Sequence, residues 1–221
     1  MTTRRTTRLS TLDYKILDSL SRIEFATRAQ LAYWCGINPA TASKTMARLL
    51  DIGLLGSITA TRPAIWHLSH SGAQIVNAKA PTDGRKITWS VMAHACHRNA
   101  LEIELTARNG QFRFLSRQAL LRQGFNPAHG EHAGVDGGNR CWFVLLDDYL
   151  MASRRIARSW QRRHAPDRNH WPDPMGRTWC EVMQRYLVCC TDAIHAESHR
   201  AWIATHDIPA DLMEMKPLWP Q

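Results

Sequence analysis

The segment 27–51 reads TRAQLAYWCGINPATASKTMARLLD and decides the fold of the first part of this chain. Thr27 predicts the N-cap of a short helix, because its side-chain oxygen can accept a backbone N–H of the first turn, and Gly36 predicts the end of that helix. Asn38 followed by Pro39 predicts the N-cap and first position of the next helix, since proline needs no N–H there. Only a short turn separates the two helices, which is typical of a helix-turn-helix corner.

The residues on either side extend this corner into a winged helix-turn-helix over residues 12–80, behind a basic N-terminal arm at 1–11. Upstream, four apolar residues at helical spacing predict a first helix: Leu12, Ile16, Leu17 and Leu20. Downstream, residues 54–58 and 64–68 predict a two-stranded ribbon, and Ser69 predicts the start of a closing helix. Three helices, a ribbon and a closing helix follow one another in the order of a winged helix.

A mixed α/β domain is predicted over residues 87–208, after a polar linker, so that the fold class is α+β. Its expected elements are helices over 89–107, 116–121, 149–164 and 177–202, and strands over 111–115 and 141–146. The Gly- and His-rich stretch 124–139 and the stretch 165–175 are expected to form loops. Residues 209–221 are expected to form a Pro-rich tail.

The charge of the chain favours a polyanionic partner. The sequence of 221 residues has 28 Lys and Arg against 19 Asp and Glu, a formal net charge of +9. Each phosphate that such a surface neutralises releases condensed counterions, which favours binding to nucleic acid. Arginine supplies most of this charge, and its planar guanidinium suits both phosphates and guanine edges.

Two groups of residues are candidate contacts to double-stranded DNA. The third helix of a winged helix enters the major groove, so the candidates of the first domain are Arg28, Thr41, Ser43, Lys44, Arg48 and Arg62. A basic helix of the second domain adds Arg154, Arg155, Arg158, Arg162 and Arg163. The first group has few bidentate base readers, which predicts a modest sequence preference. Two alternatives stay open: a docking module that does not touch nucleic acid, and a solvated basic helix face.

A family resemblance rests on the order of features along residues 12–164. The predicted winged helix is followed by a helix carrying His94, His97 and Glu102, by the Gly-rich loop Val135-Asp136-Gly137 and by a hydrophobic strand that ends in acidic residues. In this order the chain is similar to the replication-relaxation family of plasmids and integrative or conjugative elements. The resemblance implies a degenerate restriction-endonuclease-like core in the second domain. It also implies a role in plasmid replication, relaxation or conjugative transfer, with a replication or relaxase complex protein as partner.

Metal-dependent cleavage of DNA would need carboxylates that hold magnesium and a lysine that orients water. The candidate carboxylates are Glu102, Asp136, Asp147 and Asp148. The sequence has no lysine between Lys86 and Lys216, and arginine is a poor base because it does not lose its proton. We therefore predict that the protein is not an enzyme.

No metal and no cofactor is predicted. His195 and His199 lie four residues apart on one predicted helix and could both reach a zinc ion. The paired CxxC spacing of a structural zinc site is absent, as are the glycine patterns that bind nucleotide phosphates. Packed cysteines and surface histidines are therefore expected.

The sequence predicts a cytoplasmic protein without a membrane span, because its apolar stretches are short and no signal region follows the basic N-terminus. The predicted function is that of a non-catalytic accessory or regulatory protein of a mobile genetic element that binds double-stranded DNA. A winged-helix transcriptional regulator is the main alternative, and a metal-dependent nuclease is a weaker one. Whether the chain forms a homodimer stays open.

Overall fold

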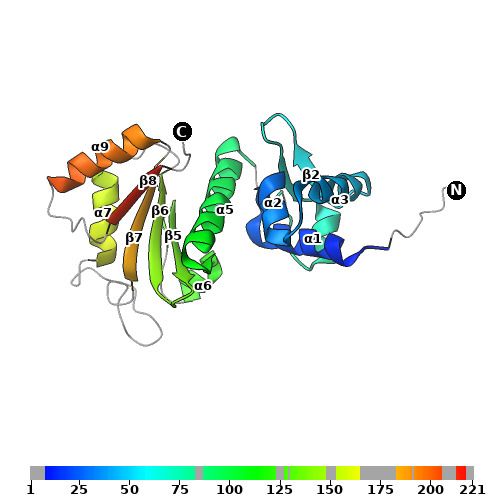
Figure 1. Ribbon diagram of the computed structural model, residues 1–221, viewed down its shortest axis with the longest axis horizontal. Helices are drawn as coiled ribbons and strands as arrows, with labels where there is room; N and C mark the ends of the chain where they lie inside the picture. The colour runs from blue at the N-terminus through cyan, green and yellow to red at the C-terminus, as the bar shows by residue number, and fades with distance from the viewer. Residues whose placement is uncertain are drawn as a thin grey trace. The chain divides into compact units, whose positions relative to one another are not determined.

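The computed structural model describes residues 8–82, 87–122, 127–128, 130–147, 153–164, 183–190, 192–205 and 213–217 (Figure 1). For residues 160–164, 183–184 and 213–217 it describes the backbone alone. The chain forms two compact units, residues 1–100 and 101–221. Among the described helices, none has both the length and the apolar composition that crossing a membrane requires.

The first unit has the element order of a winged helix. Its elements are α1 (Thr11–Ile23), β1 (Phe25–Thr27), α2 (Arg28–Cys35), α3 (Pro39–Asp51), β2 (Leu55–Ile58), β3 (Ile65–Leu68), α4 (His70–Ile75) and the first part of α5 (Trp89–Asn109). The prediction of a winged helix-turn-helix is thus confirmed. The ribbon has a third strand, because β1 pairs with β3 and the sheet order is β1-β3-β2. The sequence analysis missed β1, which is only three residues long.

The helix ends of this unit are set by their capping residues. The side chain of Thr27 accepts the backbone N–H of Gln30 and thereby caps α2, and Gly36 ends α2 in the left-handed conformation with φ 59°. Asn38 caps α3 by accepting the N–H of Thr41 at 2.8 Å. Ser69 caps α4. Each of these caps satisfies a backbone donor that the helix itself leaves unpaired, so the sequence fixes the helix boundaries locally.

The core of the first unit lies between α1, α2 and α3. It is built from fully buried aliphatic side chains that include Leu17, Leu20, Leu31, Met46 and Leu49. Burial of each such side chain stabilises the fold by about 1.5–3 kcal/mol. The first part of α5 belongs to the same unit, because the amide of Asn99 donates to the carbonyl of Phe25 at 2.8 Å and that of Gln30 donates to the carbonyl of Cys96 at 2.7 Å.

The second unit is a five-stranded mixed sheet with helices on both faces (Figure 1). Besides the end of α5 it contains β4 (Phe112–Phe114), α6 (Arg117–Arg122), β5 (Glu131–Asp136), β6 (Cys141–Asp147), α7 (Ser153–His164), β7 (Met183–Cys190), α9 (Ala193–Ala204) and β8 (Met213–Pro217). The strand order is β4-β5-β6-β7-β8, with antiparallel pairs up to β6 and parallel pairs after it.

The two faces of this sheet bury different residues. On one face, Leu101 and Leu105 of α5 pack with Trp142 and Val144 of β6. On the other face, α6, α7 and α9 pack against a second cluster, which contains Leu120, Phe143, Leu145, Ile156 and Ala196. Since side chains alternate along a strand, neighbouring residues of β6 serve opposite faces of the sheet.

Three predictions about the second domain were wrong. The predicted helix over 177–202 is the strand β7 followed by α9. Residues 186–190 form a continuous apolar run, and such a run suits a parallel strand that is covered on both faces. The predicted loop over 124–139 contains β5, and the predicted tail 209–221 contains β8. The predicted loop at 165–175 lies outside the described residues.

Gly72 gives a test of the packing in the first unit. A Cβ at this position would lie 2.0 Å from the carbonyl oxygen of Leu54, a backbone atom that cannot move independently. We expect Gly72→Ala to lower the free energy of unfolding of this unit by about 1–3 kcal/mol, despite the better helix propensity of alanine. Urea unfolding measures the change. Ser71→Ala, at an exposed position of the same helix, is the control, and equal stability of the two variants would contradict the packing described.

Candidate nucleic-acid interface

Helix α3 has one buried face and one exposed face. Ala42, Met46 and Leu49 are buried in the core of the first unit. Lys44 is exposed on the opposite face, one turn after Ala40, which is also exposed. The N-terminal half of a recognition helix faces the bases when it lies in the major groove. The packing of α3 therefore places a cation and a small apolar side chain where a groove would meet them.

Arg28 and Ser43 come together at the corner between α2 and α3. The guanidinium of Arg28 donates to the hydroxyl of Ser43 at 3.1 Å, and this hydroxyl donates to the carbonyl of Pro39 at 2.9 Å. Arg28 stays exposed and Ser43 half-buried. Thr41 is also half-buried. Two residues that the sequence predicted separately thus form one polar group beside the exposed face of α3.

Arg48 has a partner within the first unit. Its guanidinium forms an ion pair with the carboxylate of Asp13, which is fully buried on α1. The same carboxylate accepts the backbone N–H of Ser10 at 2.6 Å and completes the capping box of α1. Arg48 thus holds α3 against α1 and its charge is paired with Asp13, and its contact with DNA stays a prediction.

The pKa of Asp13 is lowered, in keeping with this pairing. Burial alone would raise the pKa of this carboxyl, but the hydrogen bond from Arg48 and those from the backbone and side chain of Ser10 hold it below its usual value. The carboxylate is therefore ionised in the folded protein at neutral pH, and the ion pair is intact there.

The wing carries an exposed cation. Arg62 lies in the loop between β2 and β3 and is exposed, as predicted for a phosphate contact. The hydroxyl of Thr61 donates to the carbonyls of Ile58 and Pro63 at 3.2 and 2.9 Å. These bonds hold the loop closed across its base, so that Arg62 projects from a defined turn.

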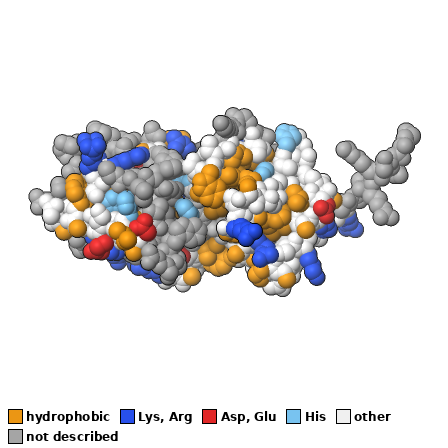
Figure 2. All heavy atoms as spheres, turned by 90° about the horizontal axis from the view of Figure 1, so that it is seen from above, with side chains coloured by type: hydrophobic (Ala, Val, Ile, Leu, Met, Phe, Trp, Pro, Cys, Tyr) orange, Lys and Arg blue, Asp and Glu red, His pale blue; other side chains and the backbone are white. Residues whose placement is uncertain are grey.

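The basic helix α7 has a polar outer face. Ile156 and Ala157 are buried in the core of the second unit, while Arg154, Arg155 and Arg158 are exposed. None of these three arginines has an acidic partner within ion-pair distance in the described part of the chain. The side chains of two further predicted residues, Arg162 and Arg163, lie outside that part. Figure 2 shows one face of the molecule, with Lys and Arg side chains exposed over both parts of the chain.

Asp136 and Asp147, two of the carboxylates proposed for a nuclease site, do not converge. Asp136 faces the α5 side of the sheet, where it accepts the indole N–H of Trp142 at 2.9 Å. Asp147 faces the opposite side, because its register partner Cys190 and its neighbour Leu145 belong to the cluster under α7 and α9. Asp148 lies outside the described residues. The two described aspartates are thus separated by the sheet and cannot share a metal ion.

The carboxylate of Asp136 accepts hydrogen bonds from the turn that follows it. Besides Trp142, its carboxylate accepts the backbone N–H groups of Gly138 and Arg140 and the guanidinium of Arg140, at 2.8 to 3.1 Å. Burial raises the pKa of Asp136, but these hydrogen bonds outweigh burial and lower it. Asp136 therefore closes the β5–β6 hairpin. Glu102 is buried on α5.

A different group of residues comes together on the α9 side of the sheet. His195 and His199 share a face of α9, as their spacing predicted, and both point at Asp147. Sequence reasoning did not join Asp147 to the histidines, because it placed residues 183–190 in a helix. Without a strand there, no register brings α9 to the end of β6.

Comparison with known proteins adds a limited likeness. No protein-family model matches the chain, and no curated protein matches it. Among solved structures, it is similar to a MarR family transcriptional regulator from Silicibacter pomeroyi DSS, with 29% identity over 30% of this chain and 46% of that chain and a TM-score of 0.29. It is also similar to Lactococcus lactis ZitR in complex with DNA, with 22% identity over 35% of this chain and 55% of that chain and a TM-score of 0.30. The match spans about half the length of each of these two proteins.

The Arg48–Asp13 pair predicts a stability effect. We expect Arg48→Ala to lower the free energy of unfolding of the first unit by about 1–2 kcal/mol, because it leaves the buried carboxylate of Asp13 without its charged partner. The partial exposure of Arg48 keeps the effect this small. Lys44→Ala, on the exposed face of the same helix, should change stability by less than about 0.5 kcal/mol. Urea unfolding of both variants measures the difference. If Arg48→Ala were as stable as the wild type, Arg48 would not be held by Asp13 and would count as a free cation.

The lowered pKa of Asp13 predicts a pH dependence. As pH falls below about 4, the unfolded chain binds a proton at this carboxyl before the folded chain does, so stability is lost with acidification. We expect unfolding free energy to fall less between pH 5 and pH 3 in Asp13→Asn than in the wild type, although Asp13→Asn starts lower. Asp18→Asn, at an exposed position of α1, should follow the wild type. Parallel acid profiles for Asp13→Asn and the wild type would refute the ion pair.

Proposed function

We propose that the chain binds double-stranded DNA through α3 and the β2–β3 wing. The observation that carries this proposal is that one cation of the first unit is paired inside the unit while others are exposed. Arg48 is neutralised by Asp13 and fixes α3, whereas Lys44 and Arg62 are exposed. Cations on the exposed face of α3 and at the tip of a wing suit the phosphates on either side of a groove.

Sequence preference should be modest. The N-terminal half of α3 offers the exposed Ala40 for contact with a thymine methyl group, and the half-buried Thr41 and Ser43 for single hydrogen bonds. The described part of α3 carries no arginine or amide side chain on its exposed face that could pair with a base through two bonds. Phosphate contacts would therefore supply most of the affinity, with a strong dependence on salt.

Helix α7 supplies a second basic surface. Arg154, Arg155 and Arg158 are exposed while the opposite face of the helix is buried, so their charge is available to a phosphate backbone. The formal net charge of +9 favours the same kind of partner.

We further propose a non-catalytic accessory or regulatory role in the replication, relaxation or transfer of a mobile genetic element. A winged helix before a mixed α/β domain supports this setting, in line with the resemblance to the replication-relaxation family. Separation of Asp136 from Asp147 by the sheet, and the lack of a lysine between Lys86 and Lys216, count against a magnesium nuclease. A transcriptional regulator would use the same α3 surface, and binding as a dimer to a palindromic operator would distinguish it.

The salt dependence of DNA binding tests the role of α3 and the wing. We expect log K of the full chain for a random duplex to fall linearly with log [salt], and the double variant Lys44→Ala/Arg62→Ala to flatten the slope by about 2, one unit for each lost phosphate contact. Lys15→Ala/Lys79→Ala removes the same charge from exposed positions outside this surface and should leave the slope near that of the wild type. Equal slopes for the two double variants would show that α3 and the wing do not face the phosphates.

The contribution of α7 is measured in the same way. If α7 contacts DNA, the triple variant Arg154→Ala/Arg155→Ala/Arg158→Ala should weaken binding similarly on every duplex and flatten the slope by about 2–3. The matched control is Arg113→Ala/Arg122→Ala/Arg185→Ala, which removes three exposed arginines of the second unit outside α7. A slope unchanged in the α7 variant would assign the basic helix to another partner or to solvent.

A further inference from the structure

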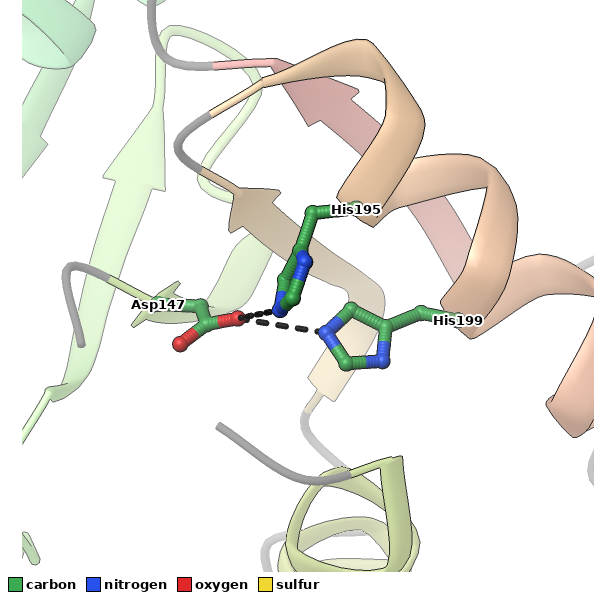
Figure 3. A group of neighbouring side chains, drawn as sticks. All are labelled: Asp147, His195 and His199. Atoms are coloured by element: carbon green, nitrogen blue, oxygen red, sulfur yellow. Dashed lines mark hydrogen bonds and ion pairs between the residues drawn. The ribbon is translucent and has the colours of Figure 1, made fainter. Parts of the chain in front are cut away.

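Three potential metal ligands meet at the end of β6. The side chain of Asp147 projects from the last residue of this strand toward α9, and His195 and His199 point back at it from successive turns of that helix (Figure 3). One ligand atom of each residue lies within 4.8 Å of the other two. The Nε2 atoms of His199 and His195 lie 3.2 and 4.0 Å from the same oxygen, Oδ2 of Asp147.

These separations suit a transition-metal ion. Zinc binds histidine nitrogen and carboxylate oxygen at about 2.0–2.2 Å in tetrahedral geometry, which sets neighbouring ligand atoms about 3.3 Å apart. The separation of His199 from Asp147 already has this value, and that of His195 needs a shift of less than 1 Å. Harder cations such as Mg²⁺ prefer oxygen ligands, so the two nitrogens select against them.

One member of this cluster, His195, lacks a hydrogen-bond partner for its Nε2 in the described part of the chain. Asp147 is fully buried, and so is this nitrogen. Its distance of 4.0 Å from Asp147 is too long for a hydrogen bond. An unpaired buried nitrogen costs about 1–3 kcal/mol, and an ion bound between it and the carboxylate would remove that cost.

Ser153 orients one of the histidines. Its hydroxyl lies 2.8 Å from Nδ1 of His199, at the first residue of α7. When the hydroxyl accepts the Nδ1 proton, Nε2 presents its lone pair to the space beside Asp147, which is the orientation of a metal-binding histidine. In this tautomer Nε2 and Oδ2 are two acceptors 3.2 Å apart, and a cation between them would satisfy both.

We propose that Asp147, His195 and His199 bind a divalent transition-metal ion of the zinc type, with Ser153 as the outer partner of His199. Three protein ligands leave one tetrahedral position for water or another small ligand. The ion would join β6 to α9 and, through Ser153, to the start of the basic helix α7. This proposal replaces the sequence-based prediction of no metal, and it does not depend on DNA binding.

Metal titration of the full-length, chelator-treated protein tests the proposal. We expect one Zn²⁺ per chain by calorimetry and elemental analysis, and a rise in the melting temperature with Zn²⁺ but not with Mg²⁺. Co²⁺ should give the visible d–d bands of tetrahedral coordination without a sulfur-to-cobalt charge-transfer band. A sulfur band would mean that cysteines bind the ion and would overturn the assignment, as would the absence of a stoichiometric site.

Variants then separate a metal site from a buried ion pair. The Nε2 of His195 has no hydrogen bond in the described part of the chain and lies 4.0 Å from Asp147, so His195→Ala should leave the closer Asp147–His199 pair intact if the cluster binds no metal. On the present account it weakens Zn²⁺ binding by more than the roughly 10–100-fold expected for Ser153→Ala. His132→Ala, a histidine of β5 outside the cluster, is the matched control and should bind Zn²⁺ like the wild type. Unchanged affinity in His195→Ala would refute the site, and its circular dichroism shows whether it is folded.

Discussion

The carboxylate of Asp13 is the constraint on which the exposed face of α3 depends. It is fully buried, caps the first turn of α1 through Ser10 and pairs with Arg48 of α3. A buried charge of this kind is costly unless it is both paired and hydrogen-bonded, so α3 cannot turn about its axis without losing the pair. The rotation of α3 is thereby fixed, and with it the direction in which Lys44 points. The pair of Asp13 and Arg48 thus determines which cations of α3 are exposed.

The second unit uses two aspartates in different ways. Asp136 receives its donors from its own hairpin, so its negative charge is satisfied within a few residues of sequence. Asp147 lies on the opposite face and meets two histidines that come from a distant helix. The first arrangement is complete as a piece of structure. In the second, a buried nitrogen of His195 has no hydrogen-bond partner among the described residues, and this difference is why the second points to a ligand.

The parts of the fold that were predictable from sequence are those with local causes. Thr27, Gly36 and Asn38 set helix ends through bonds to neighbouring backbone groups, so the helix-turn-helix could be placed correctly. The strand β7 could not, because a short apolar run fits a buried strand and a buried helix equally well until its neighbours are known. Arg48 and Asp13 lie 35 positions apart, so no local sequence pattern indicated that they pair. The meeting of Asp147 with α9 depended on β7 and was missed with it.

The central claim is that α3 and the wing bind DNA. Its most direct test is hydrogen exchange of the full chain, measured with and without a DNA duplex at low salt. If α3 and the wing face the DNA, the duplex should slow exchange at the first turn of α3 and in the wing loop around Arg62, and leave α1 and α4 unchanged. If instead the duplex changes no amide in the first unit, or only amides outside α3 and the wing, the winged helix does not bind DNA through this surface.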